Sequence, residues 1–142
     1  MYAAPGPRFE GGAGGLVSTA DDLLAFGRMM LSGRSRGERI LSRPAIELMM
    51  TDQLTPSQKQ GAELFFGNSA SWGLGGAVIT RRTDLWATPG RYGWDGGYGT
   101  SWYVDPEEKL VGILMTQRLW NASGAPVVLL DFWTSAYGAI DD

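Results

Sequence analysis

The stretch Gly90-Arg-Tyr-Gly-Trp-Asp-Gly-Gly-Tyr-Gly-Thr100 decides how this chain is organised. Five of its eleven residues are glycine, and an apolar strand pattern follows it directly. Glycine weakens a strand unless another group must approach the backbone closely, so a dense glycine run beside a strand suggests a binding site. A glycine-rich hairpin without any chemistry is the alternative, and the residues around the run decide between the two.

Composition limits the classes of protein to which the chain can belong. Its 142 residues fit one domain, and a net charge of −3 without a basic cluster gives no support for nucleic-acid binding. The sequence contains neither cysteine nor histidine, which excludes thiolate and histidine metal sites and a Ser-His-Asp triad within it. We therefore expect no metal and no cofactor, and acid–base chemistry would rest on carboxylates, lysine, tyrosine or backbone groups.

The chain divides into a short leading segment and a domain. Residues 1–15 are rich in proline, glycine and alanine, and we interpret them as a linker or as a cut inside a longer protein. Residues 16–142 carry the periodic patterns of a folded domain. No apolar run reaches the roughly 18 residues that a membrane span requires, so we expect none.

Apolar spacing predicts two helices before the strands and one helix after them. A helix over 19–32 is expected to begin after a cap at Ser18, and a second helix is expected over 43–51. Residues 52–71 have little period and predict a long loop. The last helix, over 126–138, carries apolar residues around much of its circumference, which predicts that it is largely buried against the sheet.

The middle of the chain has the alternation of β-strands. Strands are expected over 72–80, 91–96, 98–104 and 110–115, with a proline-containing hairpin turn before the last of them. The order predicts an α+β fold, in which an antiparallel meander follows two helices and a C-terminal helix packs on the sheet.

The motifs and their order resemble the C-terminal part of the serine β-lactamase-like family, which includes class C β-lactamases, family VIII esterases and DD-peptidase relatives. The segments that carry the resemblance are Gly11–Leu24, Trp72-Gly-Leu-Gly-Gly76, Gly93-Trp-Asp-Gly-Gly-Tyr-Gly-Thr100, Val104-Asp-Pro-Glu107 and Leu110–Met115. The resemblance spans about residues 9–138 and implies a partial β-lactamase/transpeptidase-like fold.

The resemblance also implies which parts of an active site are present. The family uses a Ser-x-x-Lys nucleophile, a Tyr-x-Asn or Ser-x-Asn motif, and a third motif of the type Lys-Thr-Gly, His-x-Gly or Trp-Gly-Gly. The sequence contains neither Ser-x-x-Lys nor Tyr-x-Asn or Ser-x-Asn. We expect the chain to be inactive alone and to act with the N-terminal part of a parent hydrolase on a small ester, amide or β-lactam-like substrate.

Two registers place the third motif in the glycine run. One uses Trp94-Asp95-Gly96 and the other uses Arg91-Tyr92-Gly93. We favour the second, because it keeps the required glycine and leaves an aromatic residue, a spacer and further glycines before the next strand. The resemblance then implies that residues 91–93 form a substrate-binding wall and that the backbone N–H of Trp94 is an oxyanion-hole donor.

The residues of this register depart from the family. Arg91 stands where the family has lysine or histidine, and it can grip a carboxylate but cannot easily shuttle a proton. Alternation along the strand predicts that Tyr92 points away from Arg91 and Gly93, toward the core. We place Asp95 on the same face as Tyr92 and interpret it as a structural carboxylate.

Two other functions are open at this point. Six tryptophans are compatible with a module that binds carbohydrates or other flat ligands. A non-catalytic assembly domain is the other alternative, because the family's sheet includes N-terminal strands that this chain lacks. Their absence predicts an unpaired edge at 109–117, and a homodimer or strand exchange through that edge is the hypothesis that follows.

Overall fold

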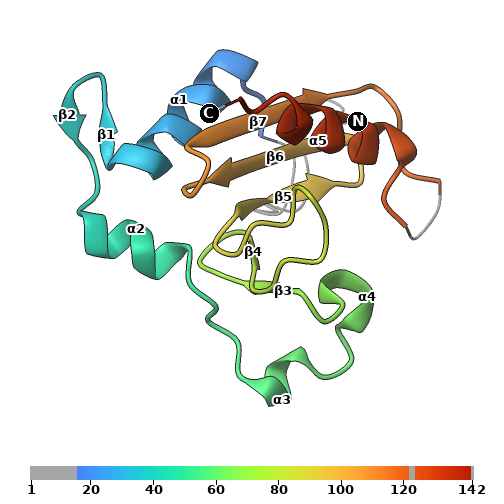
Figure 1. The fold of residues 1–142 in the computed structure, drawn as a ribbon. Coiled ribbons are helices and arrows are strands. Elements are labelled where there is room, and N and C mark those ends of the chain that lie inside the picture. Colours follow the sequence, from blue (N-terminus) through green and yellow to red (C-terminus); the bar gives the residue numbers. More distant parts are fainter. Residues whose placement is uncertain (1–15, 122–123, 142) are drawn as a thin grey trace, which may run out of the picture.

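The computed structural model describes residues 16–121 and 124–141, so the predicted linker at 1–15 lies outside the described residues. Within them, one antiparallel sheet has the strand order β3-β4-β5-β6-β7, and consecutive strands are neighbours (Figure 1). Its strands are β3 (Ala70–Trp72), β4 (Ala77–Ile79), β5 (Tyr92–Gly96), β6 (Thr100–Asp105) and β7 (Leu110–Met115). The remaining elements are α1 (Ala20–Ser32), the hairpin β1 (Arg34–Ser35) and β2 (Glu38–Arg39), α2 (Arg43–Met49), α3 (Pro56–Lys59), α4 (Glu63–Phe66) and α5 (Val127–Gly138).

The helices α1 and α5 cover opposite faces of the sheet. A Cβ at Gly27 of α1 would lie 2.6 Å from the Val111 side chain, whereas a Cβ at Gly112 would lie 2.3 Å from the Trp133 ring of α5. Neighbouring strand residues point to opposite faces, so these two contacts place one helix on each side. The α+β fold with a C-terminal helix packed on an antiparallel meander is thereby confirmed.

Each face has its own core. The α1 face buries a cluster that α1 and α2 contribute to, and its buried members are Met29, Met30, Ile46, Met50, Val78, Tyr92 and Val104. The α5 face buries a smaller aromatic cluster of Tyr103, Trp133 and Tyr137.

The helix starts follow local chemistry closely. The α1 helix begins, and its cap lies, one residue later than predicted. The cap is Thr19 and not Ser18, because the Thr19 hydroxyl accepts the Asp22 backbone N–H at 3.1 Å. The α2 helix begins after Ser42, whose hydroxyl accepts the Ala45 N–H at 3.3 Å. The connection after α1 is a small hairpin, because Arg36 and Gly37 both adopt positive φ, 49° and 86°, as a tight two-residue turn requires.

The single strand expected over 72–80 is two strands. The Gly73 N–H donates to the Gly76 carbonyl at 2.8 Å, and Gly75 adopts a φ of 91°, so the chain reverses here and β3 pairs with β4. Glycine permits this left-handed backbone without a steric penalty. The loop expected over 52–71 likewise contains the two short helices α3 and α4.

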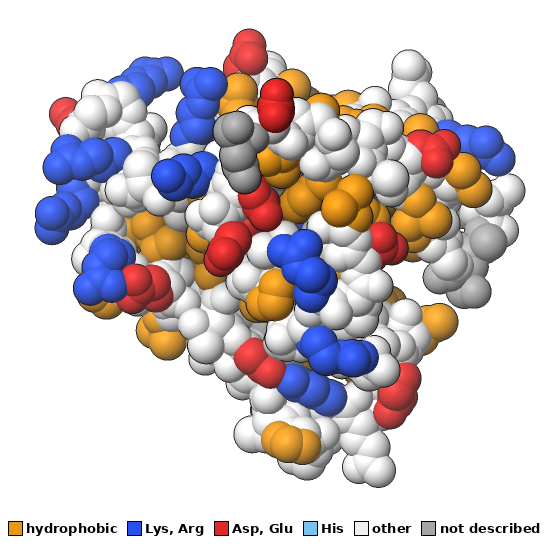
Figure 2. Space-filling view, viewed as in Figure 1, with side chains coloured by type: hydrophobic (Ala, Val, Ile, Leu, Met, Phe, Trp, Pro, Cys, Tyr) orange, Lys and Arg blue, Asp and Glu red, His pale blue; other side chains and the backbone are white. Residues whose placement is uncertain are grey.

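The last helix is buried along one side only. Its buried residues Leu129, Trp133 and Tyr137 repeat every four positions, while Val127 and Val128 are 69% and 46% exposed. The expectation that α5 is largely buried was therefore wrong, and hydrophobic side chains gather over α5 on the surface (Figure 2). In the described part of the chain, β7 is an edge strand, as predicted, and homodimer formation through it stays a prediction.

No helix among the described residues has the length and apolar character needed to cross a membrane.

The contact between Gly112 and Trp133 gives a test of how α5 is seated. Gly112→Ala would place a methyl group 2.3 Å from the Trp133 ring, so we expect the free energy of unfolding to fall by about 1–3 kcal/mol. Gly138→Ala is the matched control, because nothing lies within 4 Å of the place its methyl group would take, and its effect should stay within about 0.5 kcal/mol. Urea unfolding followed by tryptophan fluorescence measures both, and equal stabilities would contradict the described packing.

Candidate active site

Strand β5 extends past the end of β4. β4 pairs only with Tyr92 and Gly93, whereas β6 pairs with β5 along its whole length, from Tyr92 to Gly96. Residues 94–96 therefore have a strand partner on the β6 side, and among the described residues they have none on the other side. The glycine run thus ends in a free backbone edge, where an extended group of a ligand has room to approach.

The hydrogen-bonding direction of each β5 residue follows from one contact. The Ile79 N–H donates to the Arg91 carbonyl at 2.9 Å, so this carbonyl faces β4, whereas the Arg91 N–H donates to the Thr88 carbonyl at 3.0 Å. Backbone groups of successive residues point to alternate sides of a strand. Trp94 therefore faces β6, opposite Trp102, whereas the N–H of Asp95 faces the free edge.

Gly97 lies just beyond the strand, in the turn that leads to β6. The Gly99 N–H closes this turn on the Gly96 carbonyl at 2.9 Å, and the Gly97 carbonyl accepts the Trp120 N–H at 2.9 Å. Within the described residues no acceptor is found for the Gly97 N–H, and Gly97 itself is exposed. A Cβ at this position would meet nothing within 4 Å. The N–H is therefore without a described acceptor, and the place that a side chain would take is empty.

The side chain of Trp94 lies at the surface of the α1 face. Its indole is 41% exposed, and its ring centroid lies 4.9 Å from that of Trp72 in an edge-on arrangement. The ring of Phe66 in α4 is next to that of Trp72, with 6.3 Å between ring centroids. Trp94 thus exposes part of its ring to solvent and contacts the first of two further aromatic side chains.

Arg91 lies under α5. Its guanidinium carbon is 3.8 Å from the Tyr103 ring centroid and 4.0 Å from that of Trp133, and the residue is 1% exposed. Burial lowers the pKa of Arg91, while the nearby Asp95 and Asp105 carboxylates act to raise it. Among the described residues its guanidinium nitrogens have no hydrogen-bond partner, so stacking on the rings is its main interaction. Its side chain is therefore enclosed on the α5 face of the sheet.

Asp95 shares the α5 face with Arg91, so its expected placement beside Tyr92 was wrong. Three residues separate Tyr92 from Asp95, and an odd separation reverses the face on a pleated strand. The carboxylate accepts the Ser101 hydroxyl at 2.5 Å and the Tyr103 hydroxyl at 3.1 Å. Burial raises the pKa of Asp95, against the opposing effect of these hydrogen bonds. The contacts fit the structural role expected for it.

A second buried carboxylate completes this layer. Asp105 is 2% exposed and accepts the Tyr137 hydroxyl of α5 at 2.5 Å. The Trp133 indole N–H donates to the Ser101 hydroxyl at 2.8 Å, which gives α5 a further polar contact with the sheet. Sequence reasoning missed this network, although one signal was available. In this register, odd-numbered residues of β5 pair with odd-numbered residues of β6, so they share one face of the sheet. The residues involved, in these strands or next to them in the chain, are all odd-numbered: Arg91, Asp95, Ser101, Tyr103 and Asp105.

Tyr92 and Gly93 lie within the sheet and contact its neighbouring strands. Tyr92 is 3% exposed, and its hydroxyl donates to the Leu74 carbonyl at 2.6 Å, which holds the β3–β4 turn. Burial also raises the pKa of Tyr92. A Cβ at Gly93 would lie 2.0 Å from the Trp102 carbonyl, so glycine is required for strand contact. The substrate-binding roles of residues 91–93 and the donor role of Trp94 stay predictions.

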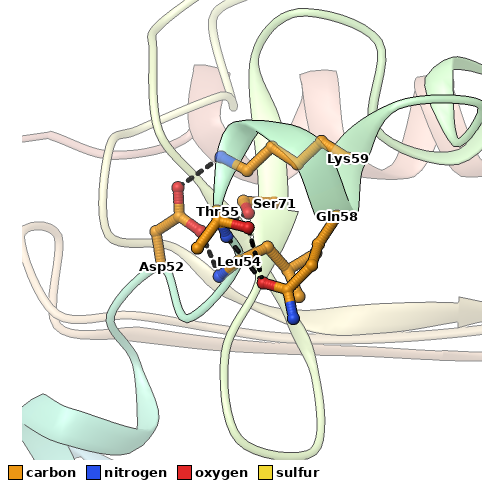
Figure 3. A network of polar contacts seen from close by, with 6 residues as sticks. All are labelled: Asp52, Leu54, Thr55, Gln58, Lys59 and Ser71. Carbon is orange, nitrogen blue, oxygen red and sulfur yellow. Dashed lines mark hydrogen bonds and ion pairs between the residues drawn. The ribbon is translucent and has the colours of Figure 1, made fainter.

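A polar network fixes the segment that carries α4 (Figure 3). The Asp52 carboxylate accepts the Ser71 hydroxyl of β3, pairs with the Lys59 ammonium at the end of α3, and accepts the Leu54 N–H at 3.0 Å. Desolvation acts to raise the pKa of Asp52, but the bonds from Lys59 and Ser71 outweigh it and lower that pKa. The network therefore ties α3 to the strand that ends in Trp72.

The fold and the position of the glycine run define the class of this chain. A family model described as Beta-lactamase matches residues 2–127, and the chain belongs to this family. The resemblance to the serine β-lactamase-like family is thereby confirmed.

The similar proteins are much longer than this chain. Protein Rv1367c of Mycobacterium tuberculosis strain H37Rv is 39% identical over 122 residues, which cover 79% of this chain and 30% of that protein. The uncharacterized protein MT1414 of strain CDC 1551 matches to the same extent. Among solved structures, a LovD6 mutant of simvastatin synthase from Aspergillus terreus is similar, with a TM-score of 0.61 and 21% identity, over 80% of this chain and 31% of that one. The chain thus spans less than a third of these proteins.

The opposite pKa shifts of Asp95 and Asp52 predict opposite pH dependences. The pKa of Asp95 is raised on folding, so its contribution to stability is fully present below the unfolded pKa, about 3.9, and is lost as pH rises through the folded pKa. The difference in unfolding free energy, wild type minus Asp95→Asn, should therefore fall as pH rises from about 4 to 7. For the control Asp52→Asn the same difference should increase as pH rises to just above the unfolded pKa, about 3.9, and then stay level, because the pKa of Asp52 is lowered.

Urea unfolding of the three proteins at several pH values measures both differences. A difference for Asp95→Asn that increases with pH would show that Asp95 is stabilised as a carboxylate, in contradiction to its burial.

Proposed function

We propose that this chain is the C-terminal sheet portion of a serine hydrolase of the β-lactamase family, and that the end of β5 forms one wall of its pocket. The family match over residues 2–127 and the partial coverage of longer relatives support this proposal. The nucleophile and the general base would lie in the part of the fold that this chain does not include, because its sequence has no Ser-x-x-Lys or Tyr-x-Asn. The substrate class is a small ester, amide or β-lactam-like compound.

The observation that carries the proposal is the direction of the backbone along β5. Because the Trp94 N–H faces β6, the register based on Arg91 would place the oxyanion donor inside the sheet. We therefore assign the third motif to the other register, Trp94-Asp95-Gly96, with the Gly97 N–H as donor. Gly97 follows this motif, its N–H has no described acceptor, and space is open beside it.

The proposed wall would stabilise charge and would not transfer protons. A backbone N–H that lies about 3 Å from the developing oxyanion stabilises it without reorganisation, which is worth about 10²–10³ in kcat for one donor. The first position of this motif is Trp94, as in the family's Trp-Gly-Gly form, and an indole is only a hydrogen-bond donor. Proton transfer would therefore fall to groups outside this chain, in agreement with its lack of histidine.

The carbohydrate-binding alternative has less support. A stacking platform needs several exposed flat rings, but of the six tryptophans, all of which the structure describes, only Trp94 is among the exposed large hydrophobic residues. Trp133 is 2% exposed and belongs to the aromatic core under α5.

A matched pair of substitutions at Gly97 tests the donor. The chain would be joined to an N-terminal portion of a β-lactamase-family protein that carries Ser-x-x-Lys and Tyr-x-Asn, and hydrolysis of p-nitrophenyl acetate would be measured. Gly97→Pro removes the N–H and should lower kcat by about 10²–10³. Gly97→Ala keeps the N–H and meets no neighbouring atom within 4 Å, so its kcat should stay within a few fold.

Two controls make the outcome decisive. The chain alone should give neither turnover nor a covalent adduct with a fluorophosphonate by intact mass, because its sequence lacks the nucleophile motif. Circular dichroism should show that both Gly97 variants are folded. Equal kcat values for folded Gly97→Pro and wild type would exclude Gly97 as donor, and an adduct on the chain alone would overturn the proposed division of the active site.

A further inference from the structure

Three aromatic side chains form a continuous surface beside the free edge of β5. Trp94 comes from β5, Trp72 from the end of β3, and Phe66 from the end of α4. Their ring centroids are 4.9 Å apart for Trp94 and Trp72, and 6.3 Å apart for Trp72 and Phe66. We call these three residues the aromatic shelf.

The shelf is apolar and partly open. Trp94 is 41% exposed, and α4 adds the exposed side chains of Leu64 and Phe65, which are 73% and 66% exposed. Phe66 and Trp72 are half-buried, so each still has ring surface available. Exposed apolar side chains that occur together, unlike single ones, mark an interaction site.

The shelf is held in place from two sides. The Asp52 network ties the loop before α4 to β3, through Ser71, next to Trp72. The Gln53 N–H donates to the Trp72 carbonyl at 2.9 Å, which fixes the backbone of Trp72 itself. A surface that is already ordered loses little side-chain entropy when a ligand binds.

The charges around the glycine run limit which ligand fits. The one cation within the run, Arg91, is 1% exposed and stacks on the rings of Tyr103 and Trp133 on the α5 face. It cannot grip the carboxylate of a substrate that approaches the free edge. The first position of the third motif, in the register assigned above, is the uncharged Trp94, as in the Trp-Gly-Gly form of the motif and unlike the forms with lysine or histidine. The site therefore favours a neutral substrate over an anionic one.

We propose that the aromatic shelf binds the apolar acyl or aryl group of a neutral ester, and that Phe66 and Trp72 determine this specificity. The proposal rests on the proposed function for its location beside the Gly97 donor. An apolar group on the shelf would direct the ester carbonyl toward the free edge of β5. Anionic substrates of similar size would bind less well, because the buried Arg91 cannot compensate the desolvation of their charge.

The six indole N–H signals of the isolated chain give a direct test, which needs no hydrolysis. Phenyl butyrate, a neutral ester, would be titrated into the ¹⁵N-labelled chain and followed by NMR. The Trp72 and Trp94 indole signals should shift and saturate, whereas the signal of Trp133, 2% exposed under α5, should not. The anion 4-phenylbutyrate should give an apparent Kd at least several-fold higher.

Variants separate the shelf from general apolar binding. Phe66→Ala and Trp72→Ala should each raise the apparent Kd for phenyl butyrate several-fold. Tyr98→Ala is the control, because Tyr98 is 74% exposed in the β5–β6 turn, outside the ring pairs that build the shelf, and it should leave the Kd unchanged. Folding of each variant is checked by the dispersion of its amide spectrum.

Each other outcome overturns the inference. An absence of saturating shifts at Trp72 and Trp94 would show that the shelf does not take an apolar group. Shifts that depend on protein concentration without the ester would show that a second copy of the chain covers it. Equal affinity for the ester and the anion would exclude selection for a neutral substrate. Because the titration uses the isolated chain, it can fail while the Gly97 variants still support the proposed function.

Discussion

Strand β5 is paired on both sides at its first two residues and on one side at its end, and the arrangement of the candidate site depends on this difference. The β3–β4 hairpin is short because glycines reverse the chain after Trp72. β4 therefore pairs with Tyr92 and Gly93 and ends before Trp94. Backbone N–H groups of successive residues point to alternate sides of a strand, so the N–H of Asp95 faces the free edge and that of Trp94 does not.

The two faces of the same strand have different roles. On the α1 face, Tyr92 is in the core and Trp94 reaches the surface, where the aromatic shelf begins. On the α5 face, Arg91 and Asp95 lie in a buried layer of rings, hydroxyls and carboxylates that attaches α5 to the sheet. The charged residues of the glycine run thus pack within the fold, whereas the Trp94 ring and Gly97 are exposed.

The sequence predicted the fold well where the pattern is local and periodic. The α+β layout, α1, α2 and the strand 110–115 follow from apolar spacing and capping residues. The prediction of a single strand over 72–80 was wrong, because two strands joined by glycines have the same composition as one strand that contains glycines. The predicted burial of the helix over 126–138 was wrong. Apolar residues around a helix do not show how many of them the rest of this chain packs against.

The site was harder to predict because it depends on pairing between distant residues. Both registers of the third motif agree with the sequence, and only the partners of β5 distinguish the direction of each N–H. The burial of Arg91 depends on Trp133, which lies on another element far along the chain. A side chain's charge is visible in the sequence, whereas the rings that enclose it are known only from the structure.

Amide hydrogen exchange along β5, measured by NMR on the isolated chain, tests the direction of these N–H groups most directly. The Trp94 amide should be protected, because it faces β6 opposite Trp102. The Asp95 and Gly97 amides should exchange quickly, close to the rate of an unstructured chain, because they face the free edge or have no described acceptor. Protection of Asp95 and Gly97 together with fast exchange of Trp94 would contradict the assigned register and return the donor role to Trp94.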